Sequence, residues 1–112
     1  MTRLPVLAST ALVLMASALY PALAQQRNQQ FTIVNGKDTP IEYVYFAACG
    51  AGEWGKDRLG ARETIEPGAR RRFTMPVTGN DCCYDLRAKM YTLATLQKLN
   101  VDICREPEWV VK

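Results

Sequence analysis

Hydrophobic and polar residues alternate with a period of two along most of the chain after residue 30, which indicates β-strands. The clearest predicted strands cover Phe31–Val34, Ile41–Ala48, Arg70–Met75 and Tyr84–Met90. Segments rich in Gly, Pro, Asn and Asp separate such runs, roughly every 8 to 12 residues. With the weaker runs there are about six to seven short strands, so we expect an all-β fold: a small antiparallel β-sandwich or barrel.

The predicted strand Ile41–Ala48 is apolar on both of its faces. Strict alternation divides its large side chains into two sets, Ile41, Tyr43 and Tyr45 on one face and Val44 and Phe46 on the other. A strand of this kind is buried on both faces, or it covers a partner with one of them.

Four weaker segments complete the predicted layout. Ala61–Ile65 is expected as a short strand, and Val101–Ile103 as a last strand. Leu93–Leu99 has Leu at every third position, which suits two helical turns better than a strand, so helix and strand stay open there. Trp109–Val111 is either a docked tail or a short strand. The predicted loops are Asn35–Pro40, Cys49–Gly60, Glu66–Gly68 and Pro76–Asp81.

The first 24 residues have the features of a helical signal peptide. Arg3 gives a positive start, Leu4–Leu19 is largely apolar and uncharged, and Ala22–Ala24 has the A-x-A pattern of a cleavage site. An uncleaved membrane helix is the less favoured alternative, because the apolar stretch is short. The expected organisation is a signal peptide at residues 1–24, a polar spacer at residues 25–30 and a single β domain at residues 31–112.

The amino-acid composition excludes some classes of function but does not indicate a particular one. The chain has 112 residues, of which 48% are hydrophobic and 22% charged, as in a single small globular domain. It contains no His, which excludes Ser-His-Asp and Cys-His catalytic arrangements and removes the commonest metal ligand. Loss of Arg3 with the leader takes the 14 basic residues to 13, against 11 acidic ones. This balance gives no drive toward nucleic acid or toward an anionic membrane.

All four cysteines lie after the predicted leader, which favours two disulfides in an oxidising compartment. Three pairings of Cys49, Cys82, Cys83 and Cys104 are possible. Alternation places Cys104 on the face opposite Val101 and Ile103, so it allows a Cys83–Cys104 bond as readily as a Cys82–Cys104 bond. A bond between the adjacent Cys82 and Cys83 would have unusual geometry.

Four stretches of the sequence together resemble a family of small exported bacterial proteins of uncharacterised function. They are Phe31–Asn35 (FTIVN), Trp54–Gly60 (WGKDRLG), Ile65–Gly68 (IEPG), and Tyr84–Arg87 (YDLR) with Asn100–Cys104 (NVDIC). The resemblance implies a small periplasmic or secreted β domain with a disulfide and no known activity. By family position it implies a Cys82–Cys104 bond, which leaves Cys49 with Cys83. This chain departs from the family in having those two further cysteines, and in having Tyr91–Leu93 where an Asp-Gly hairpin is usual.

The loop Cys49–Gly60 holds the candidate binding residues Trp54, Asp57 and Arg58. Trp54 offers a face for stacking, and Asp57 with Arg58 can orient a polar ligand. The structural alternative, which we favour, places Trp54 and Leu59 as a plug at one end of the core, with Asp57 capping a turn through backbone amides. One Asp is too few for a calcium site.

Three consecutive basic residues, Arg70–Arg72, are expected to form a solvated sheet face instead of an anion site. On a strand, Arg70 and Arg72 share one face and Arg71 points to the other, and nearby acids such as Glu63 and Glu66 can neutralise them.

We therefore expect a non-catalytic binding or structural module of the periplasm, with no cofactor, no nucleic-acid partner and no membrane insertion once the leader is cleaved. Carboxylate pairs such as Glu63 with Glu66 lack the cleft that a hydrolase needs in so small a domain. The alternative is a secreted inhibitor or effector that binds a protein partner through the Cys49–Gly60 loop. A weaker alternative is a metal-handling protein that uses Cys with Met75 or Met90.

Overall fold

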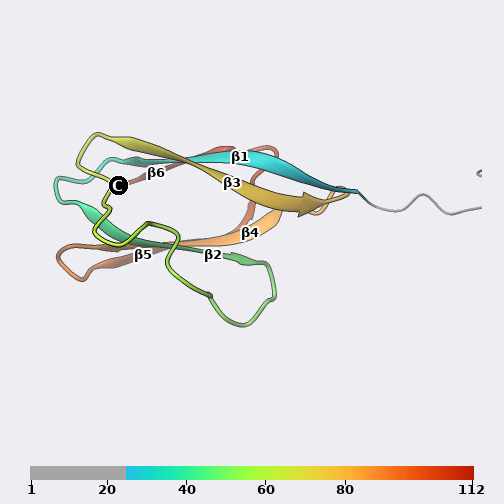
Figure 1. Cartoon of the computed structure of the whole chain (residues 1–112), viewed down its shortest axis with the longest axis horizontal. Helices are drawn as coiled ribbons and strands as arrows, with labels where there is room; N and C mark the ends of the chain where they lie inside the picture. Colours follow the sequence, from blue (N-terminus) through green and yellow to red (C-terminus); the bar gives the residue numbers. More distant parts are fainter. Residues whose placement is uncertain (1–24) are drawn as a thin grey trace, which may run out of the picture.

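The structure, a computed structural model, describes residues 25–112, so the predicted signal peptide lies outside the described residues. Six strands form two three-stranded sheets, with strand orders β3-β1-β6 and β2-β4-β5, which face each other across the core (Figure 1). The strands are β1 (Gln26–Asn35), β2 (Ile41–Ala48), β3 (Arg70–Thr78), β4 (Cys83–Met90), β5 (Thr95–Asp102) and β6 (Glu108–Val111). The expected all-β class is confirmed. Within residues 25–112 no helix is long and apolar enough to cross a membrane.

One strand pair departs from the expected antiparallel pattern. The last strand, β6, leaves the sheet that contains β5 and lies parallel to β1, with Thr32 opposite Glu108 and Asn35 opposite Val111. Trp109 and Val111 are buried, so this segment is a strand that closes the core and not a docked tail.

The core consists of alternate side chains from both sheets. Three phenylalanines connect the layers, because Phe46 from β2 packs edge-to-face against Phe31 from β1 and Phe73 from β3, with ring centroids 6.1 and 5.0 Å apart. Leu59 and Ile65 add two buried side chains from the long β2–β3 connection. Burial of this apolar surface is the main force that holds the two sheets together.

The predicted faces of β2 are wrong at its first residue. Ile41 is fully buried on the same side as Val44 and Phe46, because the pairing of β2 with β4 shifts register between Ile41 and Tyr43. This irregularity inserts one residue and reverses the alternation. Tyr43 and Tyr45 consequently lie on the outer face, where their rings stack with centroids 6.4 Å apart.

The first strand begins at Gln26, five residues before the expected start at Phe31. Its polar segment Gln26–Gln30, which we expected to be a spacer, pairs residue by residue with Thr74–Thr78 of β3. The same pairing extends β3 through Pro76, where a loop was expected. Because β3 is an edge strand, Pro76 leaves no hydrogen bond to a further neighbour unmade.

Residues 91–102 form a hairpin arm and not a helix. Leu93 donates its backbone N–H to Met90 O at 2.9 Å, and Met90 N donates to Ala94 O at 2.8 Å. This is a three-residue turn, whose last residue, Leu93, has a φ of 71°. The spacing of three residues between the leucines does not reflect a helix. Leu93 lies in the turn, and Leu96 and Leu99 point to opposite faces of β5.

The segment Ala61–Ile65 is not a strand, because only Ile65 pairs, in an isolated bridge with Ile41. The predicted turn that follows is present: Ala69 N donates to Glu66 O at 2.9 Å, and Gly68 takes a φ of 81°. That positive φ at the third turn position, with Pro67 before it, is why the turn requires Gly.

Candidate functional site

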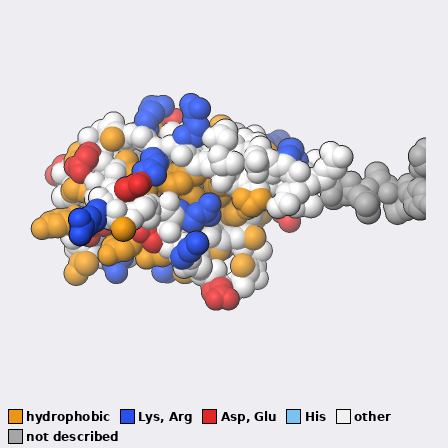
Figure 2. All heavy atoms as spheres, in the orientation of Figure 1, with side chains coloured by type: hydrophobic (Ala, Val, Ile, Leu, Met, Phe, Trp, Pro, Cys, Tyr) orange, Lys and Arg blue, Asp and Glu red, His pale blue; other side chains and the backbone are white. Residues whose placement is uncertain are grey.

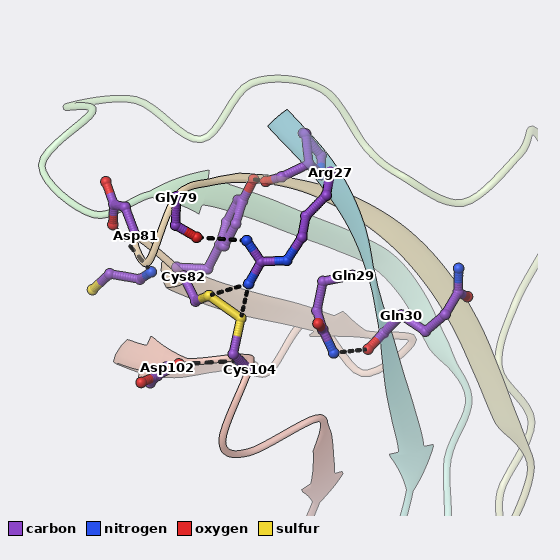
Figure 3. Close-up of a disulfide and its surroundings, with 11 residues drawn as sticks. Arg27, Gln29, Gln30, Gly79, Asp81, Cys82, Asp102 and Cys104 are labelled. Atoms are coloured by element: carbon purple, nitrogen blue, oxygen red, sulfur yellow. Dashed lines mark hydrogen bonds between the residues drawn. A yellow bond between two sulfur atoms is a disulfide. The ribbon is translucent and has the colours of Figure 1, made fainter. Parts of the chain in front are cut away.

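Two disulfides lie at one end of the sandwich and account for all four cysteines. Cys49 is bonded to Cys83 and Cys82 to Cys104, which is the pairing that the resemblance implies. Figure 3 shows the second of these bonds and its neighbours. No thiolate is left for a metal in the oxidised protein, since residues 25–112 contain no free cysteine. Met75 and Met90 are buried in the core, which removes the other ligands of the metal-handling alternative.

Asp57 has the structural role expected for it. Its Oδ1 accepts hydrogen bonds from the backbone N–H groups of Val44 at 2.9 Å and Leu59 at 3.0 Å. In the same region Arg58 N donates to Val44 O at 2.7 Å, so the loop is held against β2. The Arg58 guanidinium lies over the Phe46 ring, 5.3 Å from its centroid. The loop is therefore anchored at its second half, and Asp57 is not free to bind a ligand with this oxygen.

Trp54 does not plug the core, in contrast to the favoured expectation, although Leu59 does. Trp54 is half-buried on the outer face of the β2-β4-β5 sheet. The guanidinium of Arg87, from β4, lies over its indole ring at 4.6 Å from the centroid. With the Gln97 amide oriented so that its oxygen faces Arg87, this oxygen accepts from Nε at 3.1 Å and Nη2 at 2.7 Å. Trp54 thus covers an arginine that is already held in place.

Around this pair the sheet carries a continuous set of aromatic and basic side chains. Strand pairing places Tyr45 beside Arg87, Arg87 beside Gln97, and Tyr43 beside Lys89. Lys89 lies over the Tyr43 ring, with its Nζ 5.7 Å from the centroid. We call this surface the Trp54 face and define it by seven residues: Tyr43, Tyr45, Trp54, Arg87, Lys89, Gln97 and Leu99.

The Trp54 face contains a shallow depression of about 280 Å³. Trp54, Arg87, Gln97 and Leu99 line it, together with the acidic residues Glu53 and Asp85. Asp85 has a backbone role, because its Oδ1 accepts from Asn100 N at 2.8 Å. The loop sequence indicates Trp54 as a candidate binding residue but not the residues of β4 and β5 that surround it. The available signal was the outward alternation of Asp85, Arg87 and Lys89 along β4.

The three consecutive arginines form no anion site. Arg71 pairs with the nearby Glu63 at 2.7 Å, as expected, whereas Arg70 pairs at 3.6 Å with Glu108, an acid of β6 that is distant in the sequence. Hydrogen bonds from the Arg71 guanidinium, and to a lesser degree from the Gly60 backbone, hold the pKa of Glu63 below its ordinary value. Figure 2 shows charged side chains of both signs spread over the side in view instead of one basic patch.

Two further depressions, of about 210 and 240 Å³, lie elsewhere on the described surface. Tyr84 lines the first and donates its hydroxyl to Pro76 O at 2.5 Å, and partial burial raises its pKa. Glu63 lines the second and is paired with Arg71. Glu42 and Asp57 also line the second depression, where Asp57 Oδ1 is engaged by backbone N–H groups. The chain matches no family model, no curated protein and no solved structure.

Proposed function

We propose that the protein is an exported, non-catalytic β domain that binds a protein partner through the Trp54 face. Two disulfides in a small domain are typical of an oxidising compartment outside the cytoplasm. The leader pattern at residues 1–24 and the resemblance to small exported bacterial proteins support the periplasm or the extracellular medium as its location.

The absence of catalysis is proposed from the roles of the polar groups. Asp57 and Asp85 accept hydrogen bonds from backbone amides, and Glu63 is paired with Arg71. Acids that are engaged in this way hold the fold and are poorly placed to exchange protons with a substrate. The shallow depressions support the same view, because enzymes of small substrates enclose most of the ligand surface.

The arrangement of Trp54 over Arg87, beside Tyr45, is the observation that carries the proposed binding role. Trp, Tyr and Arg are the residue types in which the binding energy of protein–protein interfaces concentrates. Here the Gln97 bonds and the Trp54 ring restrict the Arg87 side chain before binding, which reduces the entropy lost when a partner docks.

A secreted inhibitor or effector is the second candidate, supported by how the Cys49–Gly60 loop is held. The Cys49–Cys83 bond fixes the start of the loop, and the Asp57 hydrogen bonds fix its second half, so a solvent-exposed middle is preorganised. Preorganised loops bind with less loss of entropy. In this case the partner would contact Gly50–Glu53 in addition to Trp54.

Affinity capture from the extracytoplasmic fraction of the source organism tests the proposal. The oxidised protein lacking residues 1–24 serves as bait, alongside Trp54→Ala, Arg87→Ala and the matched control Arg72→Ala on the outer face of the other sheet. We expect a partner that is retained by the parent and by Arg72→Ala but lost with either Trp54→Ala or Arg87→Ala. A partner bound equally by all four baits, or none bound by the parent, contradicts the proposal.

A variant in the Cys49–Gly60 loop distinguishes binding through this loop from binding through the Trp54 face. Replacing the exposed Ala51 by Arg changes the middle of the loop and leaves in place the Trp54–Arg87 pair and the lining of the depression on the Trp54 face. Loss of the partner in this variant favours the loop as the contact, whereas retained binding favours the sheet face.

A further inference from the structure

The two disulfides are joined by the adjacent residues Cys82 and Cys83 but have different electrostatic surroundings. Beside the Cys82–Cys104 bond, Nη2 of Arg27 lies 3.9 Å from Sγ of Cys82 and 3.6 Å from Sγ of Cys104 (Figure 3). Beside the Cys49–Cys83 bond, two side-chain oxygens contact the sulfurs: Asp85 Oδ1 lies 3.8 Å from Cys49 Sγ and Asn100 Oδ1 lies 3.9 Å from Cys83 Sγ. The guanidinium of Arg27 therefore contacts both sulfurs of the first bond, and the carboxylate of Asp85 contacts one sulfur of the second.

The position of Arg27 follows from the strand that carries it. Arg27 lies in the part of β1 that extends beyond the core, opposite Val77 of β3, on the face that also carries Phe31 and Ile33. Its Nη1 donates to the backbone oxygen of Gly79 at 2.5 Å, which directs Nη2 toward the two sulfurs. The guanidinium is thus held over the disulfide by the same polar segment that the sequence pattern does not mark as a strand.

Asp102 is a second charged group near the Cys82–Cys104 bond. Its carboxylate lies within 4.8 Å of both sulfurs, and its Oδ1 accepts from Cys104 N at 3.0 Å. Arg27 and Asp102 carry opposite charges beside the first bond, whereas the charged group in contact with Cys49 Sγ of the second bond is the carboxylate of Asp85. The difference in charge beside the two disulfides determines which of them reacts faster with a thiol.

The rate of thiol–disulfide exchange depends on nearby charges, because one sulfur of the broken bond leaves as a negatively charged thiolate. A nearby cation lowers the pKa of the leaving thiol and speeds its departure, while a carboxylate has the opposite effect. Access decides which sulfur of the Cys82–Cys104 bond is attacked, because Cys82 is 4% exposed and Cys104 is half-buried; Cys49 and Cys83 are half-buried too, so the preference between the two bonds rests on the charged groups beside them. An incoming thiolate therefore reaches Cys104 and expels Cys82.

We propose that the Cys82–Cys104 bond is a site of reversible thiol exchange, at which an external thiolate modifies Cys104. In this step the bond between the two sulfurs breaks, a new S–S bond forms between Cys104 and the incoming sulfur, and the electron pair leaves on Sγ of Cys82. The Cys82 thiolate then lies beside Nη2 of Arg27. Attack of this thiolate back on Cys104 restores the original bond and releases the incoming thiolate, so no separate oxidant is required.

The Cys49–Cys83 bond has a different role in this proposal. It stays closed during the exchange and continues to hold the Cys49–Gly60 loop against β4. The site is independent of the Trp54 face, which lies on the outer side of the β2-β4-β5 sheet, so either proposal can fail without the other.

Reaction of the folded, oxidised protein with reduced glutathione tests the site, with rapid alkylation and peptide mass spectrometry to locate each product. We expect glutathione on Cys104 and the alkyl group on Cys82 before either Cys49 or Cys83 reacts. Equal reaction of the two disulfides, or first reaction at Cys49 or Cys83, overturns the proposal. This comparison is made within one protein and does not depend on a variant that folds.

The role of Arg27 is tested by changing its charge. Arg27→Gln is expected to slow the reaction at Cys104 several-fold, because loss of the cation makes the Cys82 thiolate a poorer leaving group. Arg27→Lys is expected to restore most of the rate, and Asp102→Asn to increase it. Arg72→Gln, which removes the same charge from a distant surface, is the matched control. If Arg27→Gln and Arg72→Gln react at the same rate, Arg27 has no part in the exchange.

Discussion

The side-chain amide of Asn35 donates a 2.8 Å hydrogen bond to the backbone oxygen of Ile65, and so links the end of β1 to a loop that lies 30 residues further along the chain. The same amide donates to Thr39 O at 2.8 Å, and its oxygen accepts from Lys37 N at 2.9 Å. Asn35 is the one buried polar residue among those that the structure describes, and its side chain is fully hydrogen-bonded.

Replacement of Asn35 by Ala is expected to lower the free energy of unfolding by about 3 kcal/mol, because buried backbone groups lose their partners. Urea denaturation followed by tryptophan fluorescence measures the loss. Gln30→Ala, on an exposed position of the same strand, is the control and should change stability by less than about 0.5 kcal/mol. A loss for Asn35→Ala as small as that of the control would show that the three bonds contribute little.

Asp57→Ala is expected to free the second half of the Cys49–Gly60 loop without unfolding the sandwich. Loss of the two hydrogen bonds to Oδ1 should cost about 2 kcal/mol and speed hydrogen exchange at the Val44 and Leu59 amides. Asp57→Asn keeps an acceptor oxygen and should retain most of the protection. Glu53→Ala, in the same loop, should leave both amides unchanged. Unaltered exchange in Asp57→Ala would refute this role.

Leu93→Gly is expected to stabilise the protein by about 0.5–1 kcal/mol. Leu93 has a φ of 71° in the turn before β5 and is 72% exposed, so the substitution relieves an unfavourable backbone conformation and sacrifices little burial. Leu93→Asn should act in the same direction. Thr92→Gly, at a neighbouring position without positive φ, should be destabilising. Thermal melting distinguishes these outcomes, and a lower Tm for Leu93→Gly would contradict the argument.

The Glu63–Arg71 pair predicts a specific acid dependence. The pKa of Glu63 lies below its ordinary value of 4.5, so the pair stabilises the folded state above about that pH, and this contribution is lost as the pH falls through the lowered pKa. Arg71→Gln should return the Glu63 pKa toward 4.5 in a carboxyl NMR titration, and Arg72→Gln should not. The pair is solvent-exposed, so we expect a small effect on stability, and an unchanged Glu63 pKa in Arg71→Gln would exclude Arg71 as the cause.

The sequence predicts elements well where a local pattern and a packed face agree. The bounds Ile41–Ala48 match β2, and the alternation from Tyr84 to Met90 matches β4. The sequence predicts a strand less well where the segment is extended only because it forms backbone hydrogen bonds with a neighbouring strand. Gln26–Gln30 has no apolar face, and it is extended because β3 offers a ladder of hydrogen bonds.

Other details depend on contacts that a local pattern does not contain. The register shift after Ile41 follows from pairing with β4, and it moves Ile41 to the core and Tyr43 to the surface. The position of Trp54 depends on which surface the loop meets, and its partner Arg87 is distant in the chain. The candidate site was therefore predictable as a list of loop residues but not as a surface shared with β4 and β5.

The parallel pairing of β6 with β1 has a mechanical consequence. Tension between the start of β1 and the end of β6 pulls the two strands in opposite directions along their length, so their hydrogen bonds are loaded in shear. The covalent path under this tension also passes from Cys49 to Cys83 and from Cys82 to Cys104, and so bypasses β3 and nearly all of β4 and β5. When the molecule is stretched, β3, β4 and β5 therefore do not carry the applied force.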